Sequence, residues 1–307
     1  MGLAMLRLAH LSDVHLAPLP PVPVRLLVSK RITGWLNWHR NRGKSMGSDT
    51  LALLLDALRE SGPDHIAVTG DLTNLALPEE IERARVWLGA LGAPDAVSVI
   101  PGNHDAYVPG ALTAATASWR AHMTGERVDG EPYPYLRRLG RVALIGCSSA
   151  EATLPFQANG PFRSAQAKRL EALLRRAGGQ GLFRVVMIHH PPVREATGSL
   201  ARMLGIGRFQ RAVERAGAEL VLHGHTHLPT RHAIDTPGGR VPVVGVAAAG
   251  QAPGGHRPPA RFNLFEINGT PGKWRCLQVE IGIGSRGAVG EIDRHALAIP
   301  AAPHEGT

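Results

Sequence analysis

The stretch VLHGHTHLPT, residues 221–230, places three histidines, His223, His225 and His227, at alternate positions along the chain. Taken alone it fits a strand with core histidines, a flexible His-rich tract or a set of metal ligands. The apolar run ELVL that leads into it, residues 219–222, predicts a buried strand. The histidines therefore follow the end of a strand, and their role depends on what lies at the other strand ends.

The same arrangement, an apolar run followed by a polar motif, recurs along the chain. Such continuous apolar runs are typical of strands in a sheet that is buried on both faces. The runs and their motifs are MLRLAHL (5–11) with Asp13, HIAVT (65–69) with Gly70 and Asp71, VSVI (97–100) with PGNHD, RVVMI (184–188) with HHPP, and ELVL (219–222) with HGHTH. Because loops converge at the carboxyl ends of strands in α/β sheets, we expect these motifs to lie together.

Helical patterns lie between these strands and predict a layered α/β fold. The predicted helices cover residues 50–61, 78–91, 165–178 and 208–217. Further apolar runs at 241–249, 261–267 and 274–283 predict additional strands. We expect one domain over residues 1–283, followed by an exposed tail over residues 284–307, where the sequence carries little pattern.

Composition and charge narrow the class of protein. The chain has 307 residues, of which 44% are apolar and 19% charged, as in ordinary globular proteins. Arg7 interrupts the N-terminal apolar run, so we interpret that run as a strand and expect a cytoplasmic protein. Cys147 and Cys276 lie far apart and predict neither a disulfide framework nor a zinc-thiolate site. The net charge of +9 favours a polyanionic partner, although a solubilising surface explains it equally well.

The residue types in the motifs favour a site for transition-metal ions. Asp and His are suitable ligands for Mn, Fe and Zn. In an extended segment Asp13 and His15 point the same way and reach one ion, and His225 and His227 have the same spacing. Glycines permit the tight turns that bring backbone close to the ions, and they stand at Gly70, Gly102 and Gly224.

In this order, D-x-H, G-D, G-N-H-D, H and G-H-x-H resemble the motifs of the calcineurin-like metallophosphoesterase superfamily, over residues 13–227. The resemblance implies an α/β fold, a four-layer β-sandwich flanked by helices, with two divalent transition-metal ions (Mn, Fe or Zn). It assigns Asp13, His15 and His227 to one ion, Asn103, His189 and His225 to the other, and Asp71 to both. His190 is the alternative to His189, which stands directly at the strand end.

The resemblance also implies how such a centre works. Two divalent ions with Asp13, Asp71 and a bridging hydroxide keep about one positive charge, because Asn103 is neutral, and this suits a phosphodiester monoanion. The hydroxide attacks phosphorus, while His104 protonates the leaving oxygen or holds a phosphoryl oxygen. We expect Asp105 to orient His104 through its other ring nitrogen.

The motifs favour a phosphodiester substrate. The block GDLTNLA, residues 70–76, lacks the arginine with which the protein-phosphatase branch grips a monoester. The blocks LSDVHL, GNHD and HHPP are similar to those of small bacterial phosphodiesterases of the cyclic-nucleotide and glycerophosphodiester types. We predict a metal-dependent phosphodiesterase. The alternatives are a DNA or RNA nuclease, a lipid-linked phosphoester hydrolase and, last, a non-catalytic binding scaffold.

Residues 16–49, between the first motif and the first predicted helix, form a segment that we call the insertion. Before Asp49 it contains no acidic residue and six basic ones: Arg25, Lys30, Arg31, Arg40, Arg42 and Lys44. Val28, Ile32, Trp35 and Leu36 have helical spacing. One interpretation is a short helix packed on the domain. The other is a lid near the active site whose basic part, residues 25–44, contacts nucleic acid or the anionic inner surface of the membrane.

Overall fold

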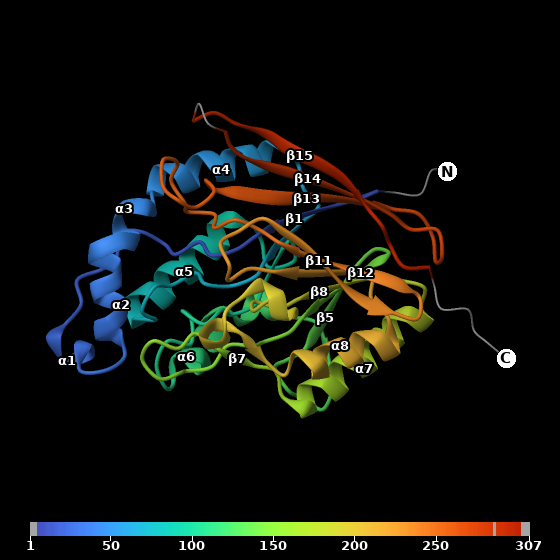
Figure 1. The fold of residues 1–307 in the computed structure, drawn as a ribbon, viewed down its shortest axis with the longest axis horizontal. Coiled ribbons are helices and arrows are strands. Elements are labelled where there is room, and N and C mark those ends of the chain that lie inside the picture. Colours follow the sequence, from blue (N-terminus) through green and yellow to red (C-terminus); the bar gives the residue numbers. More distant parts are fainter. Residues whose placement is uncertain (1–4, 285–286, 302–307) are drawn as a thin grey trace.

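Two β-sheets packed face to face form the centre of the protein (Figure 1). The computed structural model describes residues 5–284 and 287–301. The strand order is β15-β14-β13-β1-β2-β3 in the first sheet and β11-β12-β10-β8-β6-β5-β4 in the second. A separate short pair, β7 (Gly160–Pro161) with β9 (Met203–Leu204), lies outside both sheets.

The first sheet is half parallel and half antiparallel. Its parallel strands are β1 (Leu6–Leu11), β2 (His65–Val68) and β3 (Val97–Val99). Its antiparallel strands are β13 (Arg261–Asn268), β14 (Arg275–Ile283) and β15 (Val289–Leu297). Every residue of β2 and β3 is buried, as continuous apolar runs predict.

The second sheet has a parallel centre and antiparallel edges. The parallel strands are β6 (Val142–Gly146), β8 (Phe183–Met187), β10 (Leu220–His223) and β12 (Gly239–Gly245). The antiparallel strands are β4 (Glu126–Arg127), β5 (Tyr135–Leu139) and β11 (Thr230–Thr236). The carboxyl ends of β8 and β10 therefore lie side by side, as do those of β1 and β2 in the first sheet.

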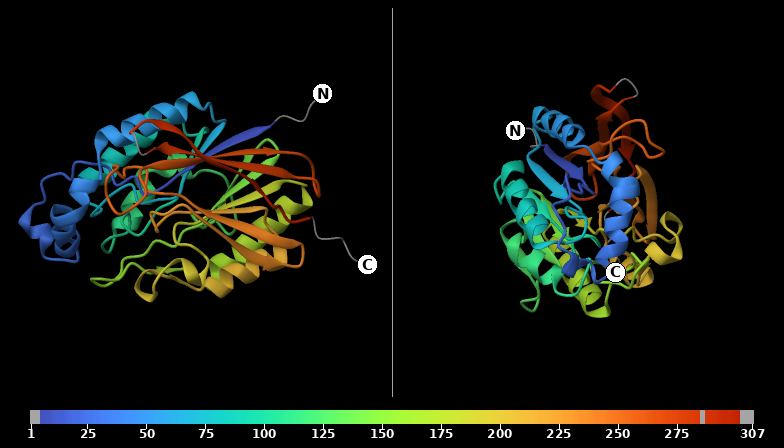
Figure 2. Two further views of the ribbon diagram at one scale, coloured as in Figure 1. Left: turned by 45° about the horizontal axis from the view of Figure 1, so that its top comes forward. Right: turned by 90° about the vertical axis from the view of Figure 1, so that its left-hand side faces the viewer.

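Helices cover the outer face of each sheet and complete four layers (Figure 2). On the first sheet lie α4 (Ser48–Glu60) and α5 (Pro78–Leu91), and on the second lie α7 (Ser164–Gly179) and α8 (Ile206–Ala216). Among the remaining short helices, α6 (Ala111–Ser118) and a 3₁₀ turn (Arg120–Met123) follow β3. The predicted four-layer α/β fold is confirmed. None of the described helices is long and apolar enough to cross a membrane.

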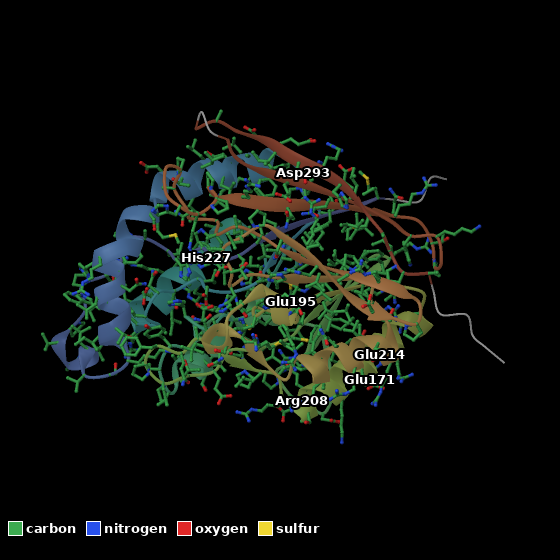
Figure 3. All side chains as sticks on the ribbon, in the orientation of Figure 1. Glu171, Glu195, Arg208, Glu214, His227 and Asp293 are labelled. Carbon is green, nitrogen blue, oxygen red and sulfur yellow. The ribbon has the colours of Figure 1, made fainter. Side chains whose placement is uncertain are left out.

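The main core lies between the sheets. Phe262 and Phe265 of β13 are fully buried in one cluster with Val185 of β8 and Leu222 of β10. A second core lies between the second sheet and its helices, where Leu173 is fully buried. Figure 3 shows the charged Arg208 and Glu214 of α8 at the outer surface of that layer, whereas His227 lies away from it.

The insertion is helical and lies at one end of the sandwich, drawn in blue in Figure 1. It contains α1 (Val24–Leu27), α2 (Arg31–Asn37), a π-helical turn (Trp38–Arg42) and α3 (Gly43–Ser45). Trp35 is half-buried and packs against the buried cluster that contains Leu75 and Tyr107, so part of this tryptophan faces the domain. The side chains of Arg42 and Lys44 lie outside the described part of the structure.

The C-terminal region differs from the prediction of a tail. Residues 289–297 form β15, which pairs antiparallel with β14 along its length. Their side chains are largely exposed, and the strand lies at the sheet edge, so the sequence carries no apolar alternation there. Backbone pairing with β14 holds this segment in place, and Val289 and Leu297 at its two ends are partly buried against the main cluster.

Candidate metal centre

The loops after five parallel strands meet at one edge of the sandwich. In the first sheet the amide of Asp13 donates to the carbonyl of Gly70 at 2.9 Å. In the second, the amide of Gly224 donates to the carbonyl of His189 at 3.1 Å. A third bond crosses between the sheets, from the amide of His225 to Asp13 Oδ2 at 2.9 Å. These hydrogen bonds therefore fix the loops that carry the predicted ligands relative to one another.

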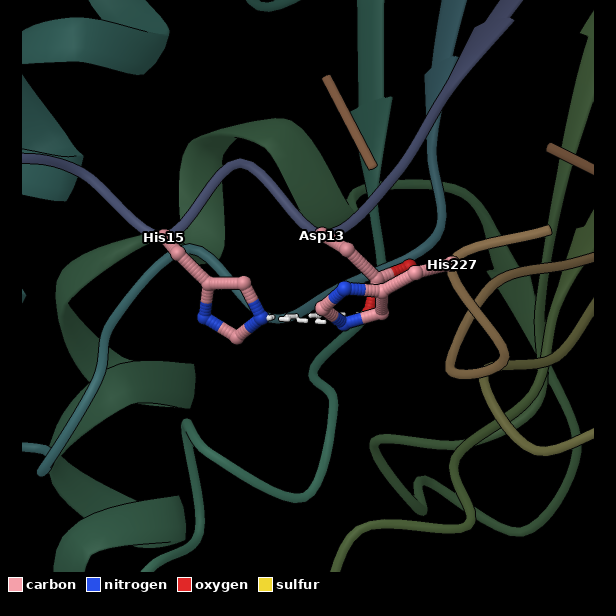
Figure 4. Close-up of side chains that lie close together, drawn as sticks. All are labelled: Asp13, His15 and His227. Carbon is pink, nitrogen blue, oxygen red and sulfur yellow. Dashed lines mark hydrogen bonds and ion pairs between the residues drawn. The ribbon is translucent and has the colours of Figure 1, made fainter. Parts of the chain in front are cut away.

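Asp13, His15 and His227 form the first group of candidate ligands (Figure 4). His227 Nε2 lies 3.2 Å from Asp13 Oδ1 and 3.3 Å from His15 Nε2, and all three side chains are buried. Asp13 and His15 follow β1, whereas His227 follows β10 of the other sheet. The structure thus brings together the three residues that we predicted to share one ion, and it draws them from both sheets.

Asn103, His189 and His225 form the second group, and Asp71 lies next to it. Asn103 Oδ1 lies 3.1 Å from His189 Nε2 and 2.8 Å from His225 Nδ1. Asp71 Oδ2 lies 3.4 Å from His189 Nε2 and 3.8 Å from His15 Nε2, which belongs to the first group. Asp71 therefore lies between the two groups, where a bridging carboxylate is expected.

Five of the seven candidate ligands have a left-handed backbone. The φ angles are 53° for Asp13, 43° for His15, 57° for Asp71, 68° for His225 and 57° for His227. A non-glycine residue in this region costs about 1–3 kcal/mol and is concentrated at functional sites. The side chains of Asp13 and His15 do converge. The prediction that these residues lie in an extended segment is wrong, because left-handed turns direct their side chains toward each other.

The three glycines of the motifs have two different roles. Gly70 has a φ of 97° and makes a turn that favours glycine. At Gly102 a Cβ would lie 2.6 Å from the amide nitrogen of Asp71, and at Gly224 it would lie 2.6 Å from Asp13 Oδ2. Gly102 and Gly224 are therefore needed for close approach to the two carboxylates.

Backbone carbonyls orient the imidazoles, a feature that sequence reasoning missed. His15 Nδ1 lies 3.0 Å from the carbonyl of Thr73, and His189 Nδ1 lies 2.7 Å from that of Thr69. His225 is held the other way round, with Nε2 at 2.8 Å from the carbonyl of Ala201. Because a carbonyl only accepts, each bonded nitrogen carries the proton and the other nitrogen presents its lone pair to the site. Every residue has a carbonyl, so no residue type marks these positions.

These orientations fit the binding of cations. With Nδ1 donating to Thr69, neutral His189 directs the Nε2 lone pair at the Asp71 carboxylate, which is repulsive unless a positive charge lies between them. Burial disfavours the charged imidazole, yet the carboxylates of Asp71 and Asp13 outweigh burial and raise the pKa of His189 to about 9. The site therefore stabilises positive charge, and its nitrogen and oxygen donors suit divalent transition metals.

His190 is directed away from the ligand groups. Its Nδ1 lies 2.8 Å from Ser149 Oγ, and its Nε2 lies 2.9 Å from the carbonyl of Ala158. Both ring nitrogens are thus occupied by protein groups, whereas His189 Nε2 faces Asp71. The geometry favours His189 as the candidate ligand.

His104 and Asp105 are adjacent in sequence but act in different places. His104 Nδ1 lies 2.6 Å from the carbonyl of Asn74. The Asp105 carboxylate instead accepts backbone N–H groups, among them those of Asp71 at 2.9 Å and Gly102 at 2.9 Å. The prediction that Asp105 orients His104 is therefore wrong, because the Asn74 carbonyl does so. Asp105 fixes the turns that carry Asp71 and the GNHD motif.

A sandwich of this kind, with buried carboxylates and imidazoles at its strand ends, has the donors of a metal site that could support hydrolysis. The profile of the calcineurin-like phosphoesterase family matches residues 6–229. The chain therefore belongs to the calcineurin-like phosphoesterase family and is a hydrolytic enzyme of the metallophosphoesterase type. Membership implies a dinuclear divalent metal site, for which the two groups supply candidate ligands.

Two curated relatives are phosphodiesterases by name. A probable cyclic nucleotide phosphodiesterase of a Synechococcus species is 24% identical over 304 residues, covering 95% of this chain and 94% of the relative. The glycerophosphodiester phosphodiesterase GpdQ of Enterobacter lignolyticus is 35% identical over 98 residues, or 32% of this chain and 29% of that protein. The first likeness extends over nearly all of both chains, and the second is local.

Solved structures share the fold at low sequence identity. A dimetal phosphatase from Danio rerio has a TM-score of 0.65 at 13% identity, covering 95% of this chain and 98% of that one. A purple acid phosphatase from yellow lupin has a TM-score of 0.59 at 13% identity, covering 95% of this chain and 53% of that one. These likenesses confirm the architecture.

Proposed function

We propose that the protein is a metal-dependent phosphodiesterase. The observation that carries the proposal is the convergence of seven donors, among which Asn103 is neutral and Asp71 lies between the two groups. With two divalent ions, a neutral Asn103 leaves net positive charge for a phosphodiester monoanion. The proposed ligands are Asp13, His15 and His227 for one ion, Asn103, His189 and His225 for the other, and Asp71 for both.

The ions, Mn, Fe or Zn, would supply a hydroxide shared between them and Lewis acidity at phosphorus. The residues of the chain then have separate tasks. Asp71 fixes the spacing of the two groups, and the carbonyls of Thr69 and Thr73 hold the imidazoles of His189 and His15 with their lone pairs directed inward. Asp105 holds the backbone of Asp71 through the amide of that residue.

His104 is the proposed general acid for the leaving oxygen. Its ring packs on Tyr107, with 5.3 Å between ring centroids, and meets the edge of His15 at 4.9 Å. Since Nδ1 bonds to the Asn74 carbonyl, Nε2 is the nitrogen that exchanges a proton with the substrate or holds a phosphoryl oxygen. One ring nitrogen of His104 lies within 4.8 Å of ligand atoms of His15 and Asp71, so it reaches the reacting centre.

The candidate substrates are cyclic nucleotides and glycerophosphodiesters, in keeping with the names of the two relatives. Nucleic acids and lipid-linked phosphoesters are the alternatives, and a non-catalytic scaffold is disfavoured because all seven donors are present. The test is a turnover panel on Mn²⁺-loaded protein with these four substrate classes, alongside metal analysis of wild type and Asp71→Ala. We expect two ions per chain in wild type and loss of ions and activity in the variant. Full activity with one ion or none would contradict the proposal.

We also propose that the insertion contacts an anionic membrane. Four aliphatic side chains spaced four residues apart are exposed: Val24 by 79%, Val28 by 86%, Ile32 by 47% and Leu36 by 37%. Exposed Arg25 and Arg40 accompany them. Nucleic acid would use the cations but not the aliphatic stripe, so an anionic bilayer fits better. This contact would place the protein in the cytoplasm at the inner membrane surface.

Vesicle co-sedimentation tests this contact. Wild type should bind phosphatidylglycerol vesicles at low salt and release them as salt rises, and Val24→Ser with Val28→Ser should bind more weakly. Val86→Ser is the matched control, since Val86 is 57% exposed on α5 outside the insertion. Absence of wild-type binding at low salt, or equal binding by all variants, would exclude the contact.

A further inference from the structure

A cleft of about 380 Å³ opens beside Asn103 and His104. One wall is the insertion, with Lys30 and Trp38, and another is the loop after β6, with Phe156 and Gln157. A space of this size takes an organic group as large as a small metabolite. The cleft therefore extends the candidate metal centre toward the part of the substrate that lies beyond the scissile phosphate.

Phe156 marks this cleft as a specialised surface. Its side chain is 83% exposed, and its backbone has a φ of 65°, which is unfavourable for a bulky residue. The turn that presents it is closed by Thr153, whose hydroxyl donates to the carbonyl of Gln157 at 2.6 Å. An unfavourable backbone conformation that presents an exposed ring is concentrated at functional sites. In this position the ring of Phe156 can cover a group bound in the cleft.

Lys30 brings a cation into the cleft without a matching anion. Its Nζ donates to Thr153 Oγ1 at 2.6 Å and to the Gln157 carbonyl at 2.8 Å, and it lies 4.8 Å from the centroid of the Tyr107 ring. Neither hydrogen bond nor ring contact supplies a negative charge. An ammonium has three N–H donors, so the two bonds leave one donor for a further partner.

Two neutral oxygens and the Tyr107 ring compensate this charge only in part, because a half-buried cation loses solvation and Lys30 forms no ion pair with the described residues. Burial lowers the pKa of Lys30 to about 8, and no carboxylate within the described ranges raises it again. The neighbouring Arg31 shows how a cation of the insertion can have a purely structural role. It donates to the carbonyls of Leu75 at 2.9 Å and Ala76 at 2.8 Å and so ties α2 to the loop after β2. Of the two neighbouring cations, Lys30 and Arg31, Lys30 is therefore the one that faces the cleft.

We propose that Lys30 forms an anion subsite of the active site, which gives preference to phosphodiesters that carry a second anionic group, a phosphate or a carboxylate. The subsite binds the second group in the cleft while the scissile phosphate lies beside Asn103 and His104. This inference rests on the proposed phosphodiesterase function and narrows its substrate class. A diester with one negative charge lacks the group that Lys30 would bind.

Two matched substrate pairs test the proposal on the full-length, Mn²⁺-loaded enzyme. The dinucleotide ApA and its 5′-phosphorylated form pApA differ by one phosphate. Glycerophosphoethanolamine and glycerophosphoserine differ by one carboxylate. A charge-assisted hydrogen bond at such a site corresponds to about 10- to 100-fold in kcat/KM in favour of the more anionic member. The pair with the larger ratio identifies the preferred anion.

Variants of the insertion assign the preference to one side chain. Lys30→Met, which keeps the length of the chain but not the charge, should bring the ratio to about 2-fold or less, in line with the loss of one charged bond. Lys30→Arg should keep much of the ratio. Arg25→Met removes an exposed cation of the insertion that does not line the cleft, and it should leave the ratio unchanged.

Calorimetric binding of ApA and pApA to the metal-free protein separates the subsite from the hydrolytic function. If both substrate pairs are hydrolysed without preference for the more anionic member, or if Lys30→Met retains the preference, the subsite is wrong and the phosphodiesterase stands. If neither is hydrolysed but pApA binds more tightly through Lys30, the subsite stands and the phosphodiesterase falls. If pApA shows neither hydrolysis nor Lys30-dependent binding, the subsite is refuted.

Discussion

Replacing Gly102 with alanine tests whether the close approach of two loops sets the position of Asp71. An alanine Cβ at this position would lie 2.6 Å from the Asp71 amide nitrogen and 2.8 Å from Asp71 Cγ, where ordinary contact begins at 3.4 Å. The differences, 3.4 − 2.6 and 3.4 − 2.8, require the amide nitrogen and Cγ of Asp71 to move by roughly 0.6–0.8 Å, and Oδ1, which lies nearer still, must move further. Asp105 resists this movement because it bonds the amides of both Asp71 and Gly102.

The shift should affect activity more than folding. A misplacement of about 1 Å costs roughly 10²-fold in rate, so we expect kcat/KM on bis(p-nitrophenyl) phosphate to fall by about 10- to 100-fold. Overpacking of this kind lowers the free energy of unfolding by about 1–3 kcal/mol. Steady-state kinetics and urea denaturation measure these two quantities, and metal analysis of the same preparation gives the number of bound ions.

Gly89→Ala is the matched control. Gly89 lies within α5, and a Cβ there has no atom within 4 Å. This variant should keep both ions and full activity, and alanine in the helix should raise the free energy of unfolding by about 0.5–1 kcal/mol. If Gly102→Ala retains two ions and the activity of Gly89→Ala, the Asp71 carboxylate is not positioned by this contact and the reasoning is refuted.

Three further perturbations probe the acid, the anion subsite and the fold. His104→Ala should keep the metal content while kcat falls by about 10²–10⁴-fold for poor leaving groups and less for p-nitrophenolate; equal losses would argue against an acid role. The pApA-to-ApA ratio of kcat/KM should be high below the pKa of Lys30 and decline as pH rises through about 8, because the amine becomes neutral; a ratio that is constant from pH 6 to 10 would contradict this. Glu219→Ala leaves the buried Arg184 without the carboxylate that lies 2.9 Å from its Nε, and it should cost about 3–5 kcal/mol by urea denaturation, against little for an exposed pair.

The fold and the candidate ligands were predictable because they depend on local signals. Continuous apolar runs predicted β1, β2, β8 and β10 to within about one residue, and a polar motif follows each of them. The family resemblance then ordered the seven donors, and the structure brings them into two adjacent groups. His189 could be separated from His190 only by the geometry, since both residues follow the same strand.

What the sequence did not predict depends on contacts between distant segments. Asp105 accepts hydrogen bonds from backbone amides that lie 32–34 residues away in the sequence, and these contacts determine its role. The carbonyl of Asn74 orients the ring of His104. The left-handed backbone of five ligands is imposed by the loops around them. Strand β15 was missed because its exposed side chains carry no alternation. Lys30 was one of six cations in the insertion, and only the cleft distinguishes it.

The two ligand groups draw on both halves of the sandwich, and this division sets an order of events during biosynthesis. Asp13, Asp71 and Asn103 precede His189, His225 and His227 by up to about two hundred residues in the chain, so a nascent polypeptide that has produced only the first sheet's parallel strands holds half a centre. If the proposed ligands hold the ions, tight uptake of metal would wait until the second sheet has docked on the first. The bound ions would then cross-link the two sheets and oppose their separation. Metal acquisition would thus act as a late checkpoint, and a chain that is truncated or misassembled at the sheet interface would remain both inactive and metal-poor.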